Sequence, residues 1–126
     1  MRDGRISAAS SISYNEGRYV KNLPVGHMEQ DVGRIMVALE QAFEDLRHRS
    51  SKYLLDTRSV SITGQMHGVV CWDSTNPKIR SRLVTWEDKR CDREFLQELK
   101  TKTGYELHSG MGIATMSWLQ RYDSKT

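Results

Sequence analysis

The sequence predicts an α/β fold in which helices flank a mixed sheet. One observation is the order of its periodic segments, which runs strand, helix, strands, helix, helix along the chain. Another is its size and composition, because 126 residues, 37% of them hydrophobic and 28% charged, are typical of one globular domain at most. The chain holds no internal repeat and no low-complexity tract, so we expect a single α/β domain.

The first half of the chain predicts one strand and one long helix. Residues 4 to 14, opened by an Asp3-Gly4 turn, mix isoleucine with serine and predict a strand. Residues 15 to 28 hold Asn, Gly and Pro and predict a loop. Residues 29 to 49 predict an amphipathic helix, because apolar side chains recur there every three or four positions. These positions are Val32, Ile35, Met36, Leu39, Phe43 and Leu46.

The second half predicts three short strands and two helices. The strands are expected at residues 59–64, 69–72 and 82–86, with a turn at 73–77. The helices are expected at residues 92–102, with Gly104 near the end, and at residues 111–122. The side chains expected to face inward are Phe95, Leu96 and Leu99 in the first helix, and Met116, Leu119 and Tyr122 or Trp118 in the second.

A Gly-Gln-Met-His-Gly cluster at residues 64 to 68 stands between two of these strands, in the stretch SITGQMHGVVCWD. The flanking glycines allow the backbone to turn and a ligand to approach closely. The side chains of Gln65 and His67 offer neutral donors and acceptors suited to hydroxyl groups, and strand ends in α/β sheets are where such sites usually lie. Taken singly, these residues favour a structural histidine beside a glycine bend, and the functional interpretation rests on their combination.

The stretch TWEDKR at residues 85 to 90 is a second candidate site. The indole of Trp86 can cover apolar C–H surface, and the carboxylate of Asp88 and the guanidinium of Arg90 can fix hydroxyl groups or each other. The structural alternative is a core tryptophan followed by a solvated charged turn. Taken alone, the segment favours that alternative.

Composition and charge point away from two classes of protein. The net charge is only +3 and basic residues are scattered among acidic ones, so the pI near 9.0 gives little support to a nucleic-acid binder. No apolar segment is long enough for a membrane span or a signal peptide. Cys71 and Cys91 have no metal-ligand spacing and are expected to be reduced, packed thiols, which fits a cytoplasmic protein.

Together, the two candidate motifs resemble the sugar-binding half of the FGGY carbohydrate kinases. SITGQMHGVV and LVTWEDKRC follow one another in the order and spacing of that family, and the resemblance spans roughly residues 3 to 122. The sequences EQD at 29–31 and SGMGIATMSWL at 109–119 are similar to further family segments. Sedoheptulokinases and xylulokinases share the main motifs, and the softer matches GVVCW, LVTWEDKRC and GMGIATMSWL favour the sedoheptulokinase branch.

The resemblance implies a fold, an activity and a site. The fold is a partial actin-like, ribonuclease H-like ATPase domain, and the activity is transfer of the γ-phosphoryl group of ATP, with Mg²⁺, to a ketose such as sedoheptulose. The residues implied to bind the sugar are Gln65, Met66, His67, Trp86, Asp88 and Arg90.

In the family, a phosphate-binding loop, a catalytic aspartate and a whole ATP-binding second domain lie outside the matched segment. We therefore expect residues 1–126 to be part of an N-terminal kinase domain that supplies sugar contacts only. This expectation includes no catalytic, cofactor-binding or metal-binding residue and no activity of the chain alone. Two alternatives stay open: a xylulokinase-type fragment, and a noncatalytic module that captures a partner at an exposed sheet edge or helix face.

Overall fold

The computed structural model describes residues 4–14, 19–76, 78 and 80–123. The chain divides into two compact units, one drawn from Met1–Gly17 and Gly33–Thr63 and the other from Arg18–Val32 and Gly64–Thr126. Each unit is described here by itself. None of the helices in the described residues is long and apolar enough to cross a membrane.

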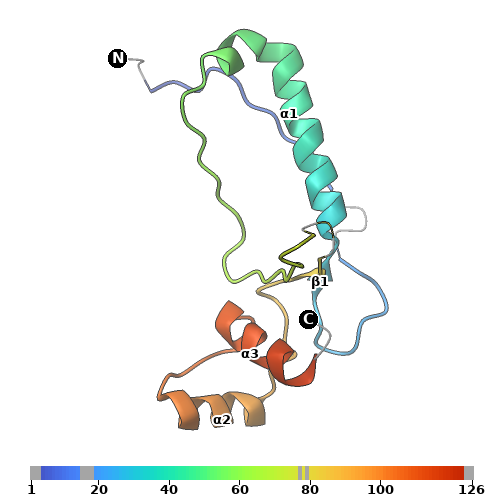
Figure 1. The fold of residues 1–126 in the computed structure, drawn as a ribbon, viewed down its shortest axis with the longest axis vertical. Helices are drawn as coiled ribbons and strands as arrows, with labels where there is room; N and C mark the ends of the chain where they lie inside the picture. The colour runs from blue at the N-terminus through green and yellow to red at the C-terminus, as the bar shows by residue number, and fades with distance from the viewer. Residues whose placement is uncertain (1–3, 15–18, 77, 79, 124–126) are drawn as a thin grey trace. The chain divides into compact units, whose positions relative to one another are not determined.

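The first unit is built on one long helix, α1 (Val32–Leu55), drawn in teal to green in Figure 1. The expected helix at 29–49 is confirmed in type, and its expected end coincides with a break at Ser50, where φ is −148° and ψ is 34°. Its expected start was wrong, because Glu29 and Gln30 form a strand instead. The apolar stripe is only partly covered, since Met36, Leu39 and Phe43 are exposed.

Two expected strands of this unit do not form. Residues 4–14 and 59–63 are described throughout and contain no strand, although Ser10 Oγ ties the first segment to α1 by donating to Asp45 Oδ2 over 2.5 Å. The strand prediction was therefore wrong for these residues. A strand is stable only when another strand satisfies its N–H and C=O groups, and alternating apolar residues such as the exposed Val60 and Ile62 do not supply that partner. The Asp3 half of the expected opening turn lies outside the described residues.

The second unit contains a small antiparallel sheet. Strand β1 (Glu29–Gln30) pairs with β2 (Leu83–Val84) in the register Glu29↔Val84 and Gln30↔Leu83. Isolated bridges extend it on both sides, from Gln30 to Tyr19 and from Val84 to Val69. The strand expected at 82–86 is thus present in shortened form, whereas residues 69–72 form no strand and contribute only isolated bridges at Val69 and Trp72. The turn expected after Trp72 forms around Asp73, whose Oδ1 accepts the N–H groups of Thr75 and Asn76 over 2.7 and 3.0 Å.

Helices α2 (Arg93–Thr103) and α3 (Gly112–Tyr122) lie side by side in this unit (Figure 1). Helix α2 begins and ends where the sequence predicts, because Asp92 Oδ1 accepts the N–H of Phe95 over 2.8 Å and Gly104 ends the helix with a φ of +76°. On α3, Leu119 is buried as expected, and of the alternatives Tyr122 and Trp118 it is Trp118 that packs against the core, whereas Met116 is exposed, so its expected inward position was wrong.

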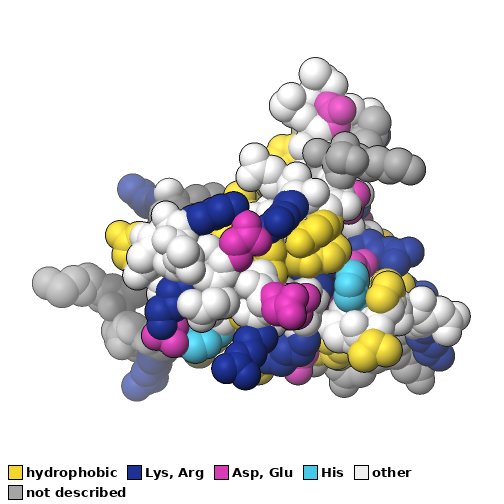
Figure 2. All heavy atoms as spheres, turned by 90° about the horizontal axis from the view of Figure 1, so that it is seen from below, with side chains coloured by type: hydrophobic (Ala, Val, Ile, Leu, Met, Phe, Trp, Pro, Cys, Tyr) yellow, Lys and Arg dark blue, Asp and Glu magenta, His cyan; other side chains and the backbone are white. Residues whose placement is uncertain are grey.

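Two apolar clusters hold the second unit together. One joins the sheet to α3 through Val69, Val84 and Leu119, and the other joins α2 to α3 through Cys91, Phe95 and Ala114. Trp118 packs against both clusters. The surface outside them is mixed in charge, and Figure 2 shows Lys and Arg side chains interspersed with Asp and Glu on the face in view.

Candidate functional site

The Gly64–Gly68 stretch is a solvent-exposed loop that turns at Met66 and His67. It leads directly into Val69, whose N–H and C=O each bond to the backbone of Val84 over 2.9 Å. His67 has a φ of +63°, in the left-handed region that costs a non-glycine residue about 1–2 kcal/mol. Strained residues of this kind cluster at functional sites. The expected loop is confirmed, although no strand precedes it.

One side chain of this loop is tied to the sheet. Gln65 Nε2 donates to the Oε1 of Gln30 over 2.8 Å, and Gln30 is fully buried in β1. Met66 and His67 are exposed, Met66 by 73%. The loop therefore exposes an amide, a thioether and an imidazole to solvent. The Gln65 amide is held by its hydrogen bond to the buried Gln30.

Unlike the loop, the 85–90 segment buries and pairs polar side chains, and Asp88 shows this most clearly. Its side chain is 1% exposed, and four N–H groups donate to its two carboxylate oxygens. One comes from the backbone of Met28 over 2.7 Å, one from the backbone of Arg90 over 2.9 Å, and two from the Arg90 guanidinium over 2.9 and 3.0 Å. Asp88 is thus occupied in holding together backbone segments that are distant in sequence.

Arg90 is equally enclosed. Its side chain is 4% exposed, and its Nη2 also donates to Glu29 Oε1 over 2.7 Å. The guanidinium carbon lies 5.3 Å from the centre of the Trp118 ring, within range of a cation–π contact. Burial alone would lower the pKa of Arg90, but hydrogen bonds to Asp88 and Glu29 outweigh it and raise that pKa. The guanidinium is therefore charged and paired at any physiological pH.

Trp86, in contrast, is 54% exposed, and its backbone lies against the Gly-Met-Gly stretch that opens α3. A Cβ placed on Gly110 would lie 1.9 Å from the Trp86 carbonyl oxygen, and one on Gly112 would lie 3.2 Å from the His67 carbonyl oxygen. Two residues span at most about 7 Å of chain. The backbones of His67 and Trp86 therefore flank one short segment, and its glycines permit that approach.

The sheet register supports the same neighbourhood. Val69 pairs antiparallel with Val84, so the register continued two residues toward the loop sets His67 opposite Trp86. The structure thus brings together the loop and the tryptophan, which the sequence separates. That their side chains face one cleft stays a prediction.

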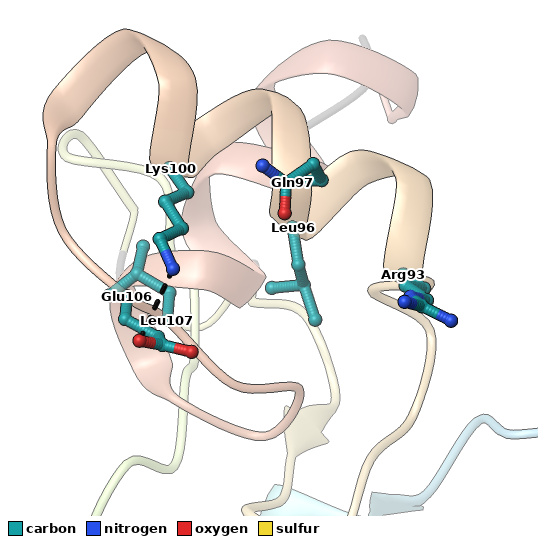
Figure 3. Close-up of a pocket in the computed structure, with 6 residues that line it drawn as sticks. All are labelled: Arg93, Leu96, Gln97, Lys100, Glu106 and Leu107. Atoms are coloured by element: carbon teal, nitrogen blue, oxygen red, sulfur yellow. Dashed lines mark ion pairs between the residues drawn. The ribbon is translucent and has the colours of Figure 1, made fainter.

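Two of the surface hollows that are lined by described residues of this unit do not include the loop or Trp86. One, of about 240 Å³, includes Arg90 among its lining residues Glu29, Ser81, Arg82, Val84, Arg90, Leu119 and Asp123. The other, of about 380 Å³, lies against α2 and is shown in Figure 3 with the Lys100–Glu106 ion pair at 3.3 Å. Its lining residues are Arg93, Leu96, Gln97, Lys100, Glu106 and Leu107. Among the described residues, no group of three or more His, Cys, Asp or Glu side chains could hold a metal ion.

Comparison with known proteins identifies the family. Residues 2–126 match the N-terminal domain of the FGGY family of carbohydrate kinases. The chain belongs to this family. Its resemblance to FGGY kinases, read from the GQMHG and WEDKR motifs, is confirmed, and the family consists of sugar phosphotransferases.

Two sedoheptulokinases are among the relatives. The chain is 35% identical to the Homo sapiens protein over 109 residues, covering 75% of the chain and 22% of that protein. It is 31% identical to the Mus musculus protein over 133 residues, covering 94% of the chain and 25% of that protein. The xylulose kinase of Escherichia coli (strain K12) is 28% identical over 101 residues, covering 75% of the chain and 20% of that protein. The chain thus spans a quarter or less of the length of these relatives.

A solved structure of a xyloylose kinase from Brucella ovis matches the fold. The TM-score is 0.70 at 25% identity, over 95% of this chain and 25% of that one. The expected α/β class, part of an actin-like FGGY kinase domain, is therefore confirmed.

Sequence reasoning did not assign a site role to the residues that support the two motifs. Met28, Glu29 and Gln30 contact Asp88, Arg90 and Gln65, but they stand 35 to 61 positions away in the chain. No spacing rule reaches that far, and the only available signal was the family-like EQD sequence itself. The packing of the Gly-Met-Gly stretch between the two motifs likewise depends on tertiary structure.

Proposed function

We propose that this chain is part of the N-terminal, sugar-binding domain of an ATP-dependent ketose kinase that converts sedoheptulose to sedoheptulose 7-phosphate. Higher identity to two sedoheptulokinases than to a xylulose kinase supports the choice of sugar. Residues 1–126 form one partial kinase domain in this proposal, and the catalytic aspartate and the second domain belong to the remainder of the enzyme.

The observation that carries the proposal is the exposed His67 loop beside the exposed Trp86. An open-chain ketose presents hydroxyl groups on one side of each carbon and C–H groups on the other. Gln65 and His67 match the hydroxyls as neutral donors and acceptors, while Met66 and Trp86 cover the C–H surface. These exposed groups support the proposal that the loop binds a polyol chain.

Asp88 and Arg90 belong to the proposed site in a different way. Both are buried, and the Asp88 carboxylate is paired with Nε and Nη2 of Arg90 and with the Met28 backbone, so direct contact between sugar and these atoms requires the Asp88–Arg90–Glu29 pairing to open. In the closed arrangement they hold the backbone that carries Trp86. We assign them this supporting role, and a sugar contact by either residue remains a prediction.

ATP and Mg²⁺ supply the phosphoryl group and offset its charge in this type of reaction. No group of three or more His, Cys, Asp or Glu side chains that could hold a metal ion is found among the described residues, and we assign no step through ATP or Mg²⁺ to them. We expect the 126-residue chain alone to show no phosphorylation of sedoheptulose.

The decisive test is His67→Ala in the complete kinase. Loss of a neutral hydrogen bond to a ketose hydroxyl costs about 1 kcal/mol or somewhat more, so the sugar KM should rise several-fold to tens-fold. The ATP KM should stay the same, because residues 61–90 are not expected to touch nucleotide. Steady-state kinetics with sedoheptulose and xylulose compares the two sugars directly.

Two further variants sharpen this test. His108→Ala removes another exposed histidine of the same unit and should leave both KM values unchanged. His67→Gly removes the imidazole and also the left-handed strain, so stability should be unchanged or higher by up to about 1 kcal/mol, while the sugar KM rises as for alanine. An unchanged sugar KM, or a loss confined to ATP, would return His67 to a purely structural role.

A further inference from the structure

Gln30 is a buried polar residue directly behind the proposed sugar loop. It lies in β1, is fully buried, and pairs with Leu83 of β2. Its neighbour Glu29 is bonded to Arg90, and successive residues of a strand point to opposite faces of a sheet. Gln30 therefore lies on the face away from the ion-paired cluster, where its Oε1 accepts the Nε2–H of Gln65 over 2.8 Å.

The other end of the Gln30 amide is unsatisfied. Its Nε2 is buried and has no hydrogen-bond partner in the part of the chain that the structure describes. A buried donor without a partner is unfavourable, and an apolar side chain of the same size would avoid that cost. Stability alone therefore does not account for glutamine at this position. The Oε1 atom of Gln30, which accepts the hydrogen bond from Gln65, accounts for it.

The hydrogen bond fixes one side of an otherwise flexible side chain. Gln65 is exposed, and an exposed glutamine samples many rotamers that it must give up when it binds a ligand. Because the amide is planar, holding Nε2 through one N–H also sets the direction of Oε1. That oxygen accepts, and the second N–H donates, without competing with Gln30.

We infer that Gln30 is a positioning residue that pre-orients the Gln65 amide toward a sugar hydroxyl. This inference rests on the proposed function, in which Gln65 contacts the ketose. Gln30 itself touches no sugar, and it acts only through Gln65 by lowering the entropy lost on binding.

The test is a double-mutant cycle in the complete kinase. Gln30→Met keeps the side-chain length and removes the acceptor. We expect the sugar KM to rise about three- to tenfold, with kcat and the ATP KM unchanged and the melting temperature equal or higher. Gln65→Ala should raise the sugar KM at least as much. In the Gln65→Ala background, Gln30→Met should have no further effect, because its route to the sugar is gone.

The outcomes separate the two proposals. If Gln65→Ala raises the sugar KM and Gln30→Met does not, the positioning role is wrong and the proposed function stands. If Gln30→Met raises KM equally in both backgrounds, its effect is structural and the inference is again wrong. If neither variant changes the sugar KM, Gln65 does not contact the sugar and the positioning role is wrong, while His67→Ala decides the proposed function separately. Gln65→Met, at the exposed end of the same hydrogen bond, provides a variant that does not alter the buried position.

Discussion

The loop at residues 64–68 and the segment at residues 85–90 lie close together, but polar side chains are exposed in the loop and buried and paired in the segment. The loop leaves the imidazole of His67 in solvent and makes one side-chain hydrogen bond to the sheet, at Gln65. The segment buries Asp88 and Arg90 and pairs them with each other, with Glu29 and with the Met28 backbone. Groups open to solvent are available to a ligand, whereas paired groups fix the backbone that carries Trp86.

This difference assigns the two motifs complementary roles. A binding site needs contact groups, and it needs supporting residues that hold those groups within a fraction of an ångström. A buried ion pair adds little net stability compared with apolar packing, but it can specify one conformation. In the proposed function, the Asp88–Arg90 pair therefore supports the site and the loop is its contact surface.

The largest expected effect on stability comes from a substitution that breaks the Asp88–Arg90 pair. Asp88→Asn removes the charge that pairs with Arg90 and places an amide N–H where a carboxylate oxygen accepted. Removing one partner of a buried ion pair costs about 3–5 kcal/mol when the other charge is left alone, and because Arg90 keeps its bond to Glu29 we expect a loss at the lower end of this range. Urea denaturation of the chain followed by tryptophan fluorescence measures this loss.

The control is Glu94→Gln, which alters an exposed carboxylate in the first turn of α2. It should change stability by no more than about 0.5 kcal/mol. An Asp88→Asn variant as stable as this control would show that the segment does not depend on its buried pair.

Local signals explain which elements could be predicted from the sequence. Helix α2 was placed correctly because its apolar spacing and both of its ends are encoded within the helix, by Asp92 and Gly104. Residues 29–30 were assigned to the wrong element because pairing with Leu83 and Val84, more than fifty positions away, decides their conformation. The strand predicted at 4–14 failed for the same reason, since alternation does not identify a partner.

The candidate site, like the fold, was predictable where its signals are local and not where they depend on residues distant in the chain. The chemistry of Gln65, His67 and Trp86, with the family resemblance, selected the loop and the indole, and the structure exposes both. The burial of Asp88 and Arg90 was not predictable, because their partners Met28 and Glu29 are 60 and 61 residues distant.

A smaller effect is expected where the Gly-Met-Gly stretch passes between the two motifs. Gly110 has a φ of +88° and a Cβ there would meet the Trp86 carbonyl oxygen, whereas Gly104 has a φ of +76° and open space around its Cβ. Gly104→Ala should therefore cost only the left-handed strain of about 1–2 kcal/mol. Gly110→Ala should cost about 1–3 kcal/mol more, because it adds overpacking.

The pair of alanine variants is matched, since backbone strain is common to both and only Gly110 is crowded. Urea denaturation gives the difference in stability. Equal losses at Gly104 and Gly110 would mean that the close approach to Trp86 is not a constraint on the site.

The smallest expected effect is a pH dependence at Cys91, the residue that follows the paired segment. Cys91 is 3% exposed and packs with Phe95 and Ala114. Burial, aided by the negative charge of Asp88, raises the pKa of its thiol from 9.0 to about 11. Between these values the unfolded chain loses the proton and the folded chain keeps it. Deprotonation then favours the unfolded state, so this stabilisation is complete below about pH 9 and is lost as the pH rises toward about 11.

The measurement is urea denaturation at pH 8 and at pH 10 for the native sequence and for Cys91→Ala. The other titrating groups, Cys71 among them, are present in both proteins, so they cancel in the comparison. The native sequence should lose about 1 kcal/mol more than the alanine variant over this range, because one unit of pKa shift corresponds to about 1.4 kcal/mol. If the two proteins lose the same stability, water reaches the Cys91 thiol in the folded state, and the segment at residues 85–90 is not closed where it meets Cys91.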